Sequence, residues 1–213
     1  MRKFSHIIWD WNGTLLNDTQ ASVNSINKML ADRNLPLLSV SQYRSIFGFP
    51  VYNFYRQAGF QVESEDWDAV SIEFHSLFLA DQSLTLHNET VTLLETLRQH
   101  GFAQAVLSAS KQSILDSMIS DYNLNLFFKW IRGIDNLYGE SKLTAGRALL
   151  AEMNVSSEKT VLIGDSLHDH EVAAELGVEC VLVACGHQSR ERLELSGGHV
   201  LDSLGELRGL LTV

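Results

Sequence analysis

The sequence predicts an α/β fold, in which a doubly wound parallel sheet carries an inserted, all-helical segment. Two observations lead to this prediction: short apolar runs alternate with helical stretches, and one long region near the start breaks that rhythm. The chain has 213 residues, of which 45% are hydrophobic and 20% charged. That length and composition suit one folded domain with a sizeable insertion.

Short apolar runs predict the strands of the sheet. Runs of this length, bounded by Gly, Ser or Asp, are typical of strands that are buried on both faces of a parallel sheet. The four runs are HIIW at 6–9, AQAVLS at 103–108, TVLIG at 160–164 and CVLVA at 180–184. In the tail, 189–213, we expect a polar helix, a short HVL strand and a last helix from Ser203.

Helical stretches separate these runs, and each carries apolar residues at helical spacing. They are predicted at 89–100, 111–120, 142–153 and 168–176. Because strands and helices alternate along the chain, the expected core is a Rossmann-like doubly wound sheet.

Residues 17–83 contain no convincing strand and are predicted to form a helical insertion. Apolar stripes at helical spacing run through 23–30 and 67–78. Between them, two short helices are expected on either side of a break at 48–50. The longer stripe is interpreted as the core of this insertion.

The insertion divides the chain into two predicted domains. The core domain combines residues 1–16 with 84–213, because the first strand must join the strands that follow the insertion. The helical domain takes residues 17–83.

The charge of the chain narrows the classes of partner. A formal net charge of −10 argues against nucleic acid, because neutralising its phosphates needs Lys and Arg. An acidic protein still binds a small phosphorylated substrate if a cation bridges the two. The first apolar stretch is too short for a signal peptide or a membrane span, and Cys180 and Cys185 suit reduced thiols. We therefore expect a cytoplasmic protein without a membrane partner, and the oligomeric state is left open.

Polar side chains follow the predicted strands. Asp10 follows the first strand, Ser108 the second, and Asp165 and Asp169 the third major run, while Lys142 opens a helix. Ligands of open α/β sheets bind beyond the carboxyl ends of the strands. These groups are therefore expected to converge at one edge of the sheet.

This set of groups suits phosphoryl transfer. Asp10 is the candidate nucleophile, which would form an aspartyl phosphate, and with Asp165 it would hold a Mg²⁺ ion. Ser108 and nearby backbone N–H groups, including that of Ala109, are candidates for binding the phosphate oxygens. The ammonium of Lys142 would offset the negative charge of the phosphate and of Asp10.

Four motifs appear in order between residue 6 and about residue 185. They are DWNGT for Asp-x-Asp-Gly-Thr, VLSAS for a strand ending in Ser or Thr, GESKLTAG for a Lys opening a helix, and GDSLHDHEVAAELG for Gly-Asp-x-x-x-Asp. The third lacks the common Pro after Lys. Together they resemble the motifs of the haloacid dehalogenase superfamily, in its phosphatase branch.

The resemblance carries expectations for fold and site. It implies that 17–83 is a cap similar to that of phosphoglycolate phosphatases and their relatives, and that the substrate is a small phosphate ester. It implies that Asp10 is the nucleophile, that Asp165 is a metal ligand, and that Asp169 supports the metal waters or Lys142. The residue two places after the nucleophile would offer its backbone carbonyl to the metal.

That residue is Asn12, where family phosphatases have Asp. The family's Asp protonates the leaving oxygen and then activates water, and an amide cannot transfer a proton in this way. General acid–base help is typically worth about 10²–10⁴-fold. We therefore expect a slow enzyme, another proton route, or a substrate whose leaving group needs little help. Slow dephosphorylation would trap a phosphoenzyme.

Other functions stay open beside the Mg²⁺-dependent phosphatase. A phosphonate hydrolase has a similar Asp-Trp-Ala-Gly-Thr motif, but it needs a cap lysine, and 17–83 offers Lys28 alone. A dehalogenase uses no metal, which the intact acid pair of the fourth motif argues against. A catalytically weak, phosphate-sensing protein would keep the site without turnover. Deamidation of the Asn12–Gly13 pair to Asp would give an active fraction.

The remaining polar candidates are less defined. Arg44 and Arg56 flank the break at 48–50, so either would bind a substrate carboxylate or stay a solvated helix charge. His168 is interpreted as a surface or supporting residue, and His187 as an isolated, ordinary one.

Overall fold

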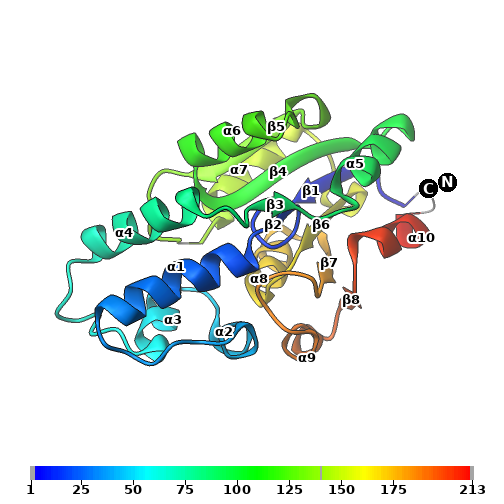
Figure 1. Cartoon of the computed structure of the whole chain (residues 1–213). Helices are drawn as coiled ribbons and strands as arrows, with labels where there is room; N and C mark the ends of the chain where they lie inside the picture. Colours follow the sequence, from blue (N-terminus) through cyan, green and yellow to red (C-terminus); the bar gives the residue numbers. More distant parts are fainter. Residues whose placement is uncertain (1–2, 140, 212–213) are drawn as a thin grey trace.

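The computed structural model describes residues 3–139 and 141–211, and its centre is a six-stranded parallel sheet (Figure 1). The strand order is β5-β4-β1-β6-β7-β8. The strands are β1 (His6–Trp9), β4 (Ala103–Lys111), β5 (Trp130–Ile134), β6 (Thr160–Gly164), β7 (Glu179–Val183) and β8 (His199–Leu201). Every neighbouring pair is parallel, which confirms the predicted doubly wound sheet.

Helices cover both faces of this sheet. The core helices are α5 (Thr90–Gln99), α6 (Gln112–Asp121), α7 (Leu143–Met153), α8 (Leu167–Leu176), α9 (Arg190–Leu193) and α10 (Leu207–Leu211). Short 3₁₀ turns lie at Asn125–Phe127, Ser157–Lys159, Glu194–Ser196 and Leu204–Glu206. Ile7 and Trp9 of β1 pack with residues of α5, α6 and α10, whereas Ile8 packs with residues of α7 and α8. Because successive side chains of a strand point to opposite faces, β1 is buried on both sides.

Strand β5 was missing from the sequence-based prediction. Its sequence, WIRGI, places Arg132 and Gly133 in the middle of the strand, and both are partly exposed. β5 lies at the edge of the sheet, where polar residues are tolerated, so it lacks the continuous apolar run of a central strand. β4 also runs to Lys111, beyond its predicted end at residue 108.

Four helices between the first strand and the rest of the sheet form the inserted region, which we call the cap. They are α1 (Thr19–Asp32), α2 (Val40–Ile46), α3 (Val51–Ala58) and α4 (Trp67–Ala80). They share a buried apolar cluster that includes Ile26, Leu30, Tyr43 and Phe54. This cluster supports the division at 17–83, which stays a prediction.

Two short strands lie where the chain enters and leaves the cap. β2 (Leu16–Asn17) pairs antiparallel with β3 (Thr85–Leu86), and neither strand was predicted from the sequence. With two residues each, they are too short to show an alternating pattern. They hold the two crossing segments side by side.

Local signals fix the ends of the cap helices. The Ser39 hydroxyl accepts a hydrogen bond from the backbone N–H of Gln42, whose side chain accepts one from the backbone N–H of Ser39. This capping box begins α2. Helix α3 ends at Gly59, whose φ of 107° few other residues adopt.

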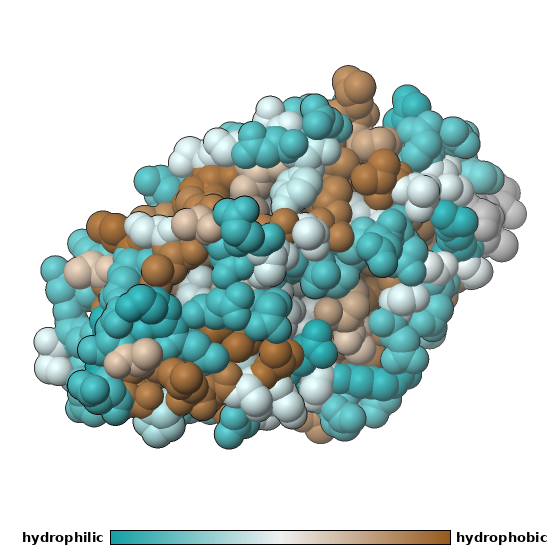
Figure 2. Space-filling view, in the orientation of Figure 1, coloured by the Kyte–Doolittle hydropathy of each residue, from teal (hydrophilic) through white to brown (hydrophobic). Residues whose placement is uncertain are grey.

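Within residues 3–139 and 141–211, no helix combines the length and the apolar character needed to cross a bilayer. Hydrophilic residues cover α1 in Figure 2, whereas α4 also exposes Ile72 and Leu79. Cys180 and Cys185 are free thiols, as expected. A cytoplasmic location stays a prediction.

Candidate active site

Asp10 lies at the centre of the sheet's carboxyl edge. It directly follows β1, which pairs with β4 on one side and β6 on the other. Its backbone N–H donates to the carbonyl of Ile163, at 2.8 Å, so the residue is held against β6. The side chain of Asp10 is almost fully buried.

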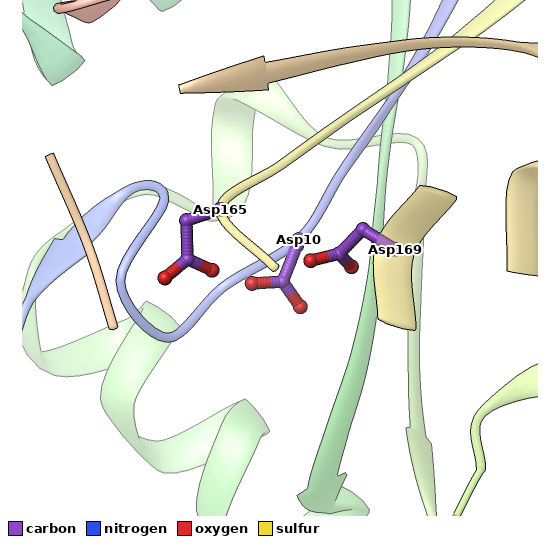
Figure 3. Close-up of side chains that lie close together, drawn as sticks. All are labelled: Asp10, Asp165 and Asp169. Atoms are coloured by element: carbon purple, nitrogen blue, oxygen red, sulfur yellow. The ribbon is translucent and has the colours of Figure 1, made fainter. Parts of the chain in front are cut away.

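Two further carboxylates lie beside Asp10 (Figure 3). Asp165 follows β6, and Asp169 lies in the first turn of α8. The Ser166 hydroxyl and the backbone N–H of Ser166 both donate to Oδ2 of Asp169, which fixes that carboxylate at the start of the helix. Asp10, Asp165 and Asp169 each offer an oxygen, and these oxygens lie within 4.8 Å of one another.

Lys142 supplies positive charge to this cluster. Its ammonium lies 2.5 Å from Oδ1 of Asp10 and 2.6 Å from Oδ1 of Asp169, and it donates to the carbonyl of Leu107. Burial works to lower the pKa of Lys142, but the two carboxylates raise it on balance. Burial likewise works to raise the pKa of Asp169, but Lys142 lowers it on balance. Lys142 is therefore a fixed cation.

When all of these groups are ionised, three carboxylates face one ammonium, and the repulsion shifts the pKa values of the acids. Burial raises the pKa of Asp10 to about 8, with the neighbouring acids adding to the effect of burial and Lys142 opposing it. Burial also raises the pKa of Asp165 to about 6, against the opposing effect of His187. A divalent cation beside Asp10 and Asp165 would relieve this repulsion, and carboxylate oxygens are the ligands that Mg²⁺ prefers. The residues therefore fit a divalent metal.

Gly13 and Thr14 pack closely around the acids. Gly13 has a φ of +76°, and a Cβ there would lie 2.2 Å from Oδ2 of Asp165, so a larger side chain does not fit. The Thr14 hydroxyl lies 3.2 Å from Oδ2 of Asp10 and 3.4 Å from Oδ1 of Asp165. The DWNGT motif thereby places its Gly and Thr against both acids.

Asn12 is bound at both ends of its side-chain amide. Nδ2 donates to Oδ2 of Asp18, and Oδ1 accepts from the Ser110 hydroxyl, both at 2.7 Å. The other oxygen of Asp18 accepts from the backbone N–H of Gly13, also at 2.7 Å. Asp18 is 1% exposed, so position 12 faces a fixed, buried carboxylate.

His187 extends this network. Its backbone N–H donates to Oδ2 of Asp165 at 2.5 Å, its Nε2 lies 3.2 Å from Oδ1 of Asp18, and its Nδ1 lies 3.0 Å from the Tyr43 hydroxyl. Burial works to lower its pKa, but Asp18 outweighs burial and the pKa rises to about 9. His187 is therefore an imidazolium at neutral pH.

Asp18 was not among the predicted site residues, and His187, interpreted from the sequence as ordinary, belongs to the site network. One signal was available for His187, because it follows the apolar run of β7 just as Asp165 follows that of β6. Asp18 offered no such signal, since it lies between a two-residue strand and the first cap helix. His168 is also buried, and its ring stacks on Phe49 with 4.4 Å between centroids.

A cavity of about 130 Å³ lies between the core and the cap. Its core side brings together seven of the predicted site residues: Asp10, Asn12, Ser108, Ala109, Lys142, Asp165 and Asp169. The Ser108 hydroxyl accepts from the backbone N–H of Ser110 at 3.0 Å and lines the same space. The geometry gathers these residues, and their individual roles stay predictions.

Three cap residues considered from sequence lie elsewhere. Neither Arg44 nor Arg56 is among the described residues that line the cavity. Arg44 donates to the carbonyl of Cys185, and Arg56 is exposed and donates to Asn53. Lys28 is also exposed and pairs with Asp32 in the next turn of α1. These positions give no support to a carboxylate-binding arginine or a Schiff-base lysine.

The loop between α2 and α3 is bound to the core. Arg192 donates to the carbonyls of Arg44 and Phe47, at 2.9 and 2.5 Å, and Gln188 donates to the same Phe47 carbonyl at 3.0 Å. With the bond from Arg44 to Cys185, these contacts fasten the cap over the cavity.

Comparison with known proteins identifies the family. A model of haloacid dehalogenase-like hydrolases matches residues 7–183. The chain belongs to this family. Among curated relatives, this hydrolase is 23% identical over 215 residues to a phosphoglycolate phosphatase of Pseudomonas putida, covering 96% of this chain and 78% of that one. The resemblance read from the four motifs is confirmed, and these matches support the predicted enzyme class, a phosphoric monoester hydrolase.

Solved structures show the same fold. A predicted phosphatase of Clostridium acetobutylicum superposes with a TM-score of 0.82 at 20% identity, covering 99% of both chains. Protein tyrosine kinase A of Mycobacterium tuberculosis superposes with a TM-score of 0.81 at 21% identity, also covering 99% of both chains. At these identities, the likeness establishes the fold of this hydrolase, an α/β core with a helical cap.

Proposed function

We propose that this hydrolase is a Mg²⁺-dependent phosphatase that cleaves a small phosphate monoester through an aspartyl phosphate on Asp10. The observation that carries the proposal is the position of the Asp10 carboxylate. It lies at the cavity, bound to the Lys142 ammonium and beside Asp165. A buried nucleophile, a fixed cation and a second acid are the parts that phosphoryl transfer needs.

In the first step, an oxygen of Asp10 attacks the phosphorus of the ester. The new Asp10–phosphorus bond forms while the bond to the ester oxygen breaks, and that oxygen leaves with the electron pair and takes up a proton. In the second step, water attacks the phosphorus of the aspartyl phosphate. Inorganic phosphate leaves, and the Asp10 carboxylate is restored.

Lys142 and Ser108 have supporting roles in this proposal. The Lys142 ammonium lowers the cost of bringing an anionic phosphate to an anionic carboxylate. The Ser108 hydroxyl lines the cavity and is placed to bind a phosphate oxygen. Asp169 holds Lys142 in position through their 2.6 Å ion pair.

The metal would be held by Asp10 and Asp165, with the backbone carbonyl of Asn12 as the further ligand that the motif implies. When bound, Mg²⁺ would neutralise charge and let the phosphate approach the nucleophile. The raised pKa values of Asp10 and Asp165 support a divalent cation at this place, because such a cation would favour their ionised forms.

The cap is proposed to open and close over the site and to select the substrate. The bonds from Arg192 and Gln188 to the loop between α2 and α3 are the contacts that opening would break. The relatives' name, phosphoglycolate phosphatase, suggests a small phosphorylated metabolite by analogy.

A phosphate-binding protein with little turnover is the second candidate, and Asn12 favours it. Its amide is held by Asp18 and Ser110, and it offers no transferable proton. The two candidates differ in whether free phosphate accumulates beyond one equivalent of protein.

The test is phosphate release from a panel of small phosphate esters, with Mg²⁺ and with a chelator. The panel is run on the unmodified protein, on Asn12→Asp and on Asp10→Asn as the blank. We expect the unmodified protein to turn over at least one ester with Mg²⁺, and Asp10→Asn to turn over none. Turnover by Asn12→Asp alone would favour the binding role, and turnover by Asp10→Asn would contradict the mechanism.

A further inference from the structure

The cavity wall beyond Asp10 is aromatic. Most of this wall comes from the cap, where α4 and the segment from α2 to α3 face the core. The cap side chains that form it include Phe47, Phe49, Phe54, Trp67, Phe74 and Phe78. Ile114, Met118 and Leu137 continue the apolar surface on the core side. An apolar wall of this kind favours an apolar or aromatic group on the substrate.

The cations at this cavity are already paired with carboxylates of the protein. Among the described residues that line the cavity, Lys142 is the sole lysine or arginine, and Asp10 and Asp169 bind its ammonium. The ring of His187 also lines the cavity, and it is paired with Asp18 at 3.2 Å. His75 lines the cap side, but burial lowers its pKa, so its ring is neutral near pH 7. A substrate carboxylate would enter this space without a partner, which is costly.

The cavity is large enough for one ring. Its volume is about 130 Å³. For comparison, an apolar cavity of about 150 Å³ lined by Leu, Ile and Phe binds benzene. This volume includes the phosphate position, so it limits the leaving group to at most about one ring.

Position 12 points to the same chemistry independently. The Asn12 amide supplies no proton to a leaving oxygen, and its Nδ2 is already bound to Asp18. A phenol loses its proton with a pKa of about 10, as in tyrosine, whereas an aliphatic alkoxide is far more basic. A phenolate therefore leaves with little help from a general acid, and an alkoxide does not.

We propose that the substrate is an aryl phosphate, a phosphate monoester of a phenolic hydroxyl, whose ring lies against the aromatic wall of the cap. This inference rests on the proposed phosphatase function. An oxygen of Asp10 bonds to phosphorus while the bond between phosphorus and the phenolic oxygen breaks. The phenolate leaves with the electron pair and takes its proton from water.

The first experiment compares kcat/KM for phenyl phosphate, cyclohexyl phosphate and 2-phosphoglycolate. Phenyl and cyclohexyl phosphate are similar in size but differ in the basicity of the leaving oxygen. Because kcat/KM covers the steps up to formation of the phosphoenzyme, slow dephosphorylation does not mask the difference. We expect phenyl phosphate to exceed both others by about 10²-fold or more, since general acid help is absent.

A second comparison tests the wall itself with a matched pair of variants on α4. Ser71 is buried and lines the cavity, whereas Ser76 lies on the same helix and is exposed. Ser71→Leu fills the ring space, so it should raise the KM for phenyl phosphate about tenfold. The KM for acetyl phosphate, which carries no ring, should rise much less than the KM for phenyl phosphate. Ser76→Leu should change the KM for neither phenyl phosphate nor acetyl phosphate.

A binding measurement covers the case in which Ser71→Leu does not fold. Calorimetry on Asp10→Asn with Mg²⁺ should show phenylphosphonate binding at least tenfold more tightly than methylphosphonate. Equal binding of the two phosphonates would contradict recognition of the ring.

The outcomes separate this inference from the proposed function. Phosphate release with similar kcat/KM for phenyl and cyclohexyl phosphate, or with a preference for 2-phosphoglycolate, would overturn the aryl assignment and leave the phosphatase function standing. No release from any ester, acetyl phosphate included, would overturn both.

Discussion

The side-chain amide of Asn12 donates a hydrogen bond to the carboxylate of Asp18, with 2.7 Å between Nδ2 and Oδ2. Asp18 is buried, and it also accepts the backbone N–H of Gly13 and pairs with His187. The residue that family phosphatases use as acid and base is therefore replaced here by a neutral donor with a fixed partner. Because Asn12 is held by Asp18 and has no acidic proton, we expect slow hydrolysis of esters whose leaving group needs a general acid.

Restoring the acid at position 12 should speed up the hydrolysis of alkyl esters. In Asn12→Asp, a carboxyl group replaces the amide at the position where family phosphatases have their acid and base, so a proton donor is again present beside the leaving oxygen. We expect phosphate release from cyclohexyl phosphate to rise by about 10²-fold or more. Asn12→Ala removes the amide without adding an acid and serves as the control. An Asn12→Asp protein no faster than the unmodified one would contradict this reading.

Asn12 should resist deamidation in the folded protein. Deamidation requires the backbone nitrogen of Gly13 to attack the Asn12 amide carbon. The Gly13 N–H is bound to Asp18, and the amide is held between Asp18 and Ser110. Peptide mapping of fresh and aged samples should find Asn at position 12. Activity that grows with a fraction carrying Asp at this position would show that these bonds do not protect it.

Lys142→Met should strongly destabilise the fold in the absence of metal. The substitution keeps much of the side-chain volume but leaves Asp10 and Asp169 buried without their cation. Breaking a buried ion pair in this way costs about 3–5 kcal/mol. Urea unfolding measures the loss, and Lys28→Met is the matched control. The exposed pair of Lys28 with Asp32 should contribute at most about 1 kcal/mol, so equal losses in the two variants would refute the assignment.

The stability of the metal-free protein should fall as the pH rises through the titration of His187. The pKa of His187 is about 9 in the folded protein and 6.5 as the ordinary value. A raised pKa means that the folded state holds the proton more tightly, so this contribution is complete below pH 6.5 and is lost through about pH 9. This difference between the two pKa values corresponds to roughly 3 kcal/mol in the free energy of unfolding.

The predicted loss of stability is measured by thermal unfolding between pH 6 and 10. The melting temperature of the unmodified protein is compared with that of His187→Gln at each pH. The raised pKa values of Asp10 and Asp165 also favour the folded state at low pH, but these acids titrate in both proteins. The difference between the two curves therefore reports the titration of His187 together with its effect on Asp165, whose pKa His187 lowers. Parallel curves would show that the imidazolium does not stabilise the fold.

The strands that surround the site were predictable because they are buried on both faces. β1, β6 and β7 read as continuous apolar runs, and each brings a polar residue to the carboxyl edge of the sheet. Edge strand β5 was not predicted, because Arg132 and Gly133 interrupt the apolar run of its sequence. A strand that is covered on both faces has a continuous apolar run, and this run allows it to be predicted from a single sequence.

The network around Asn12 could not be predicted, for a different reason. Asp18, Tyr43 and His187 come from three segments that only folding brings together, and no spacing in the sequence links them. Arg44 shows that a position in the sequence does not by itself define a contact. Its position beside the break at 48–50 suggested a substrate contact, whereas its guanidinium is bound to the carbonyl of Cys185.

The most direct test of the central claim is to look for phosphate on Asp10. Phenyl phosphate and Mg²⁺ are mixed with the protein, the reaction is stopped in acid within the first turnover, and the peptides are analysed by mass spectrometry. We predict one phosphoryl group on the peptide that contains Asp10, accompanied by one equivalent of phenol, and neither in Asp10→Asn. Phenol release with no phosphoryl group on that peptide, or with undiminished release from Asp10→Asn, would contradict the account.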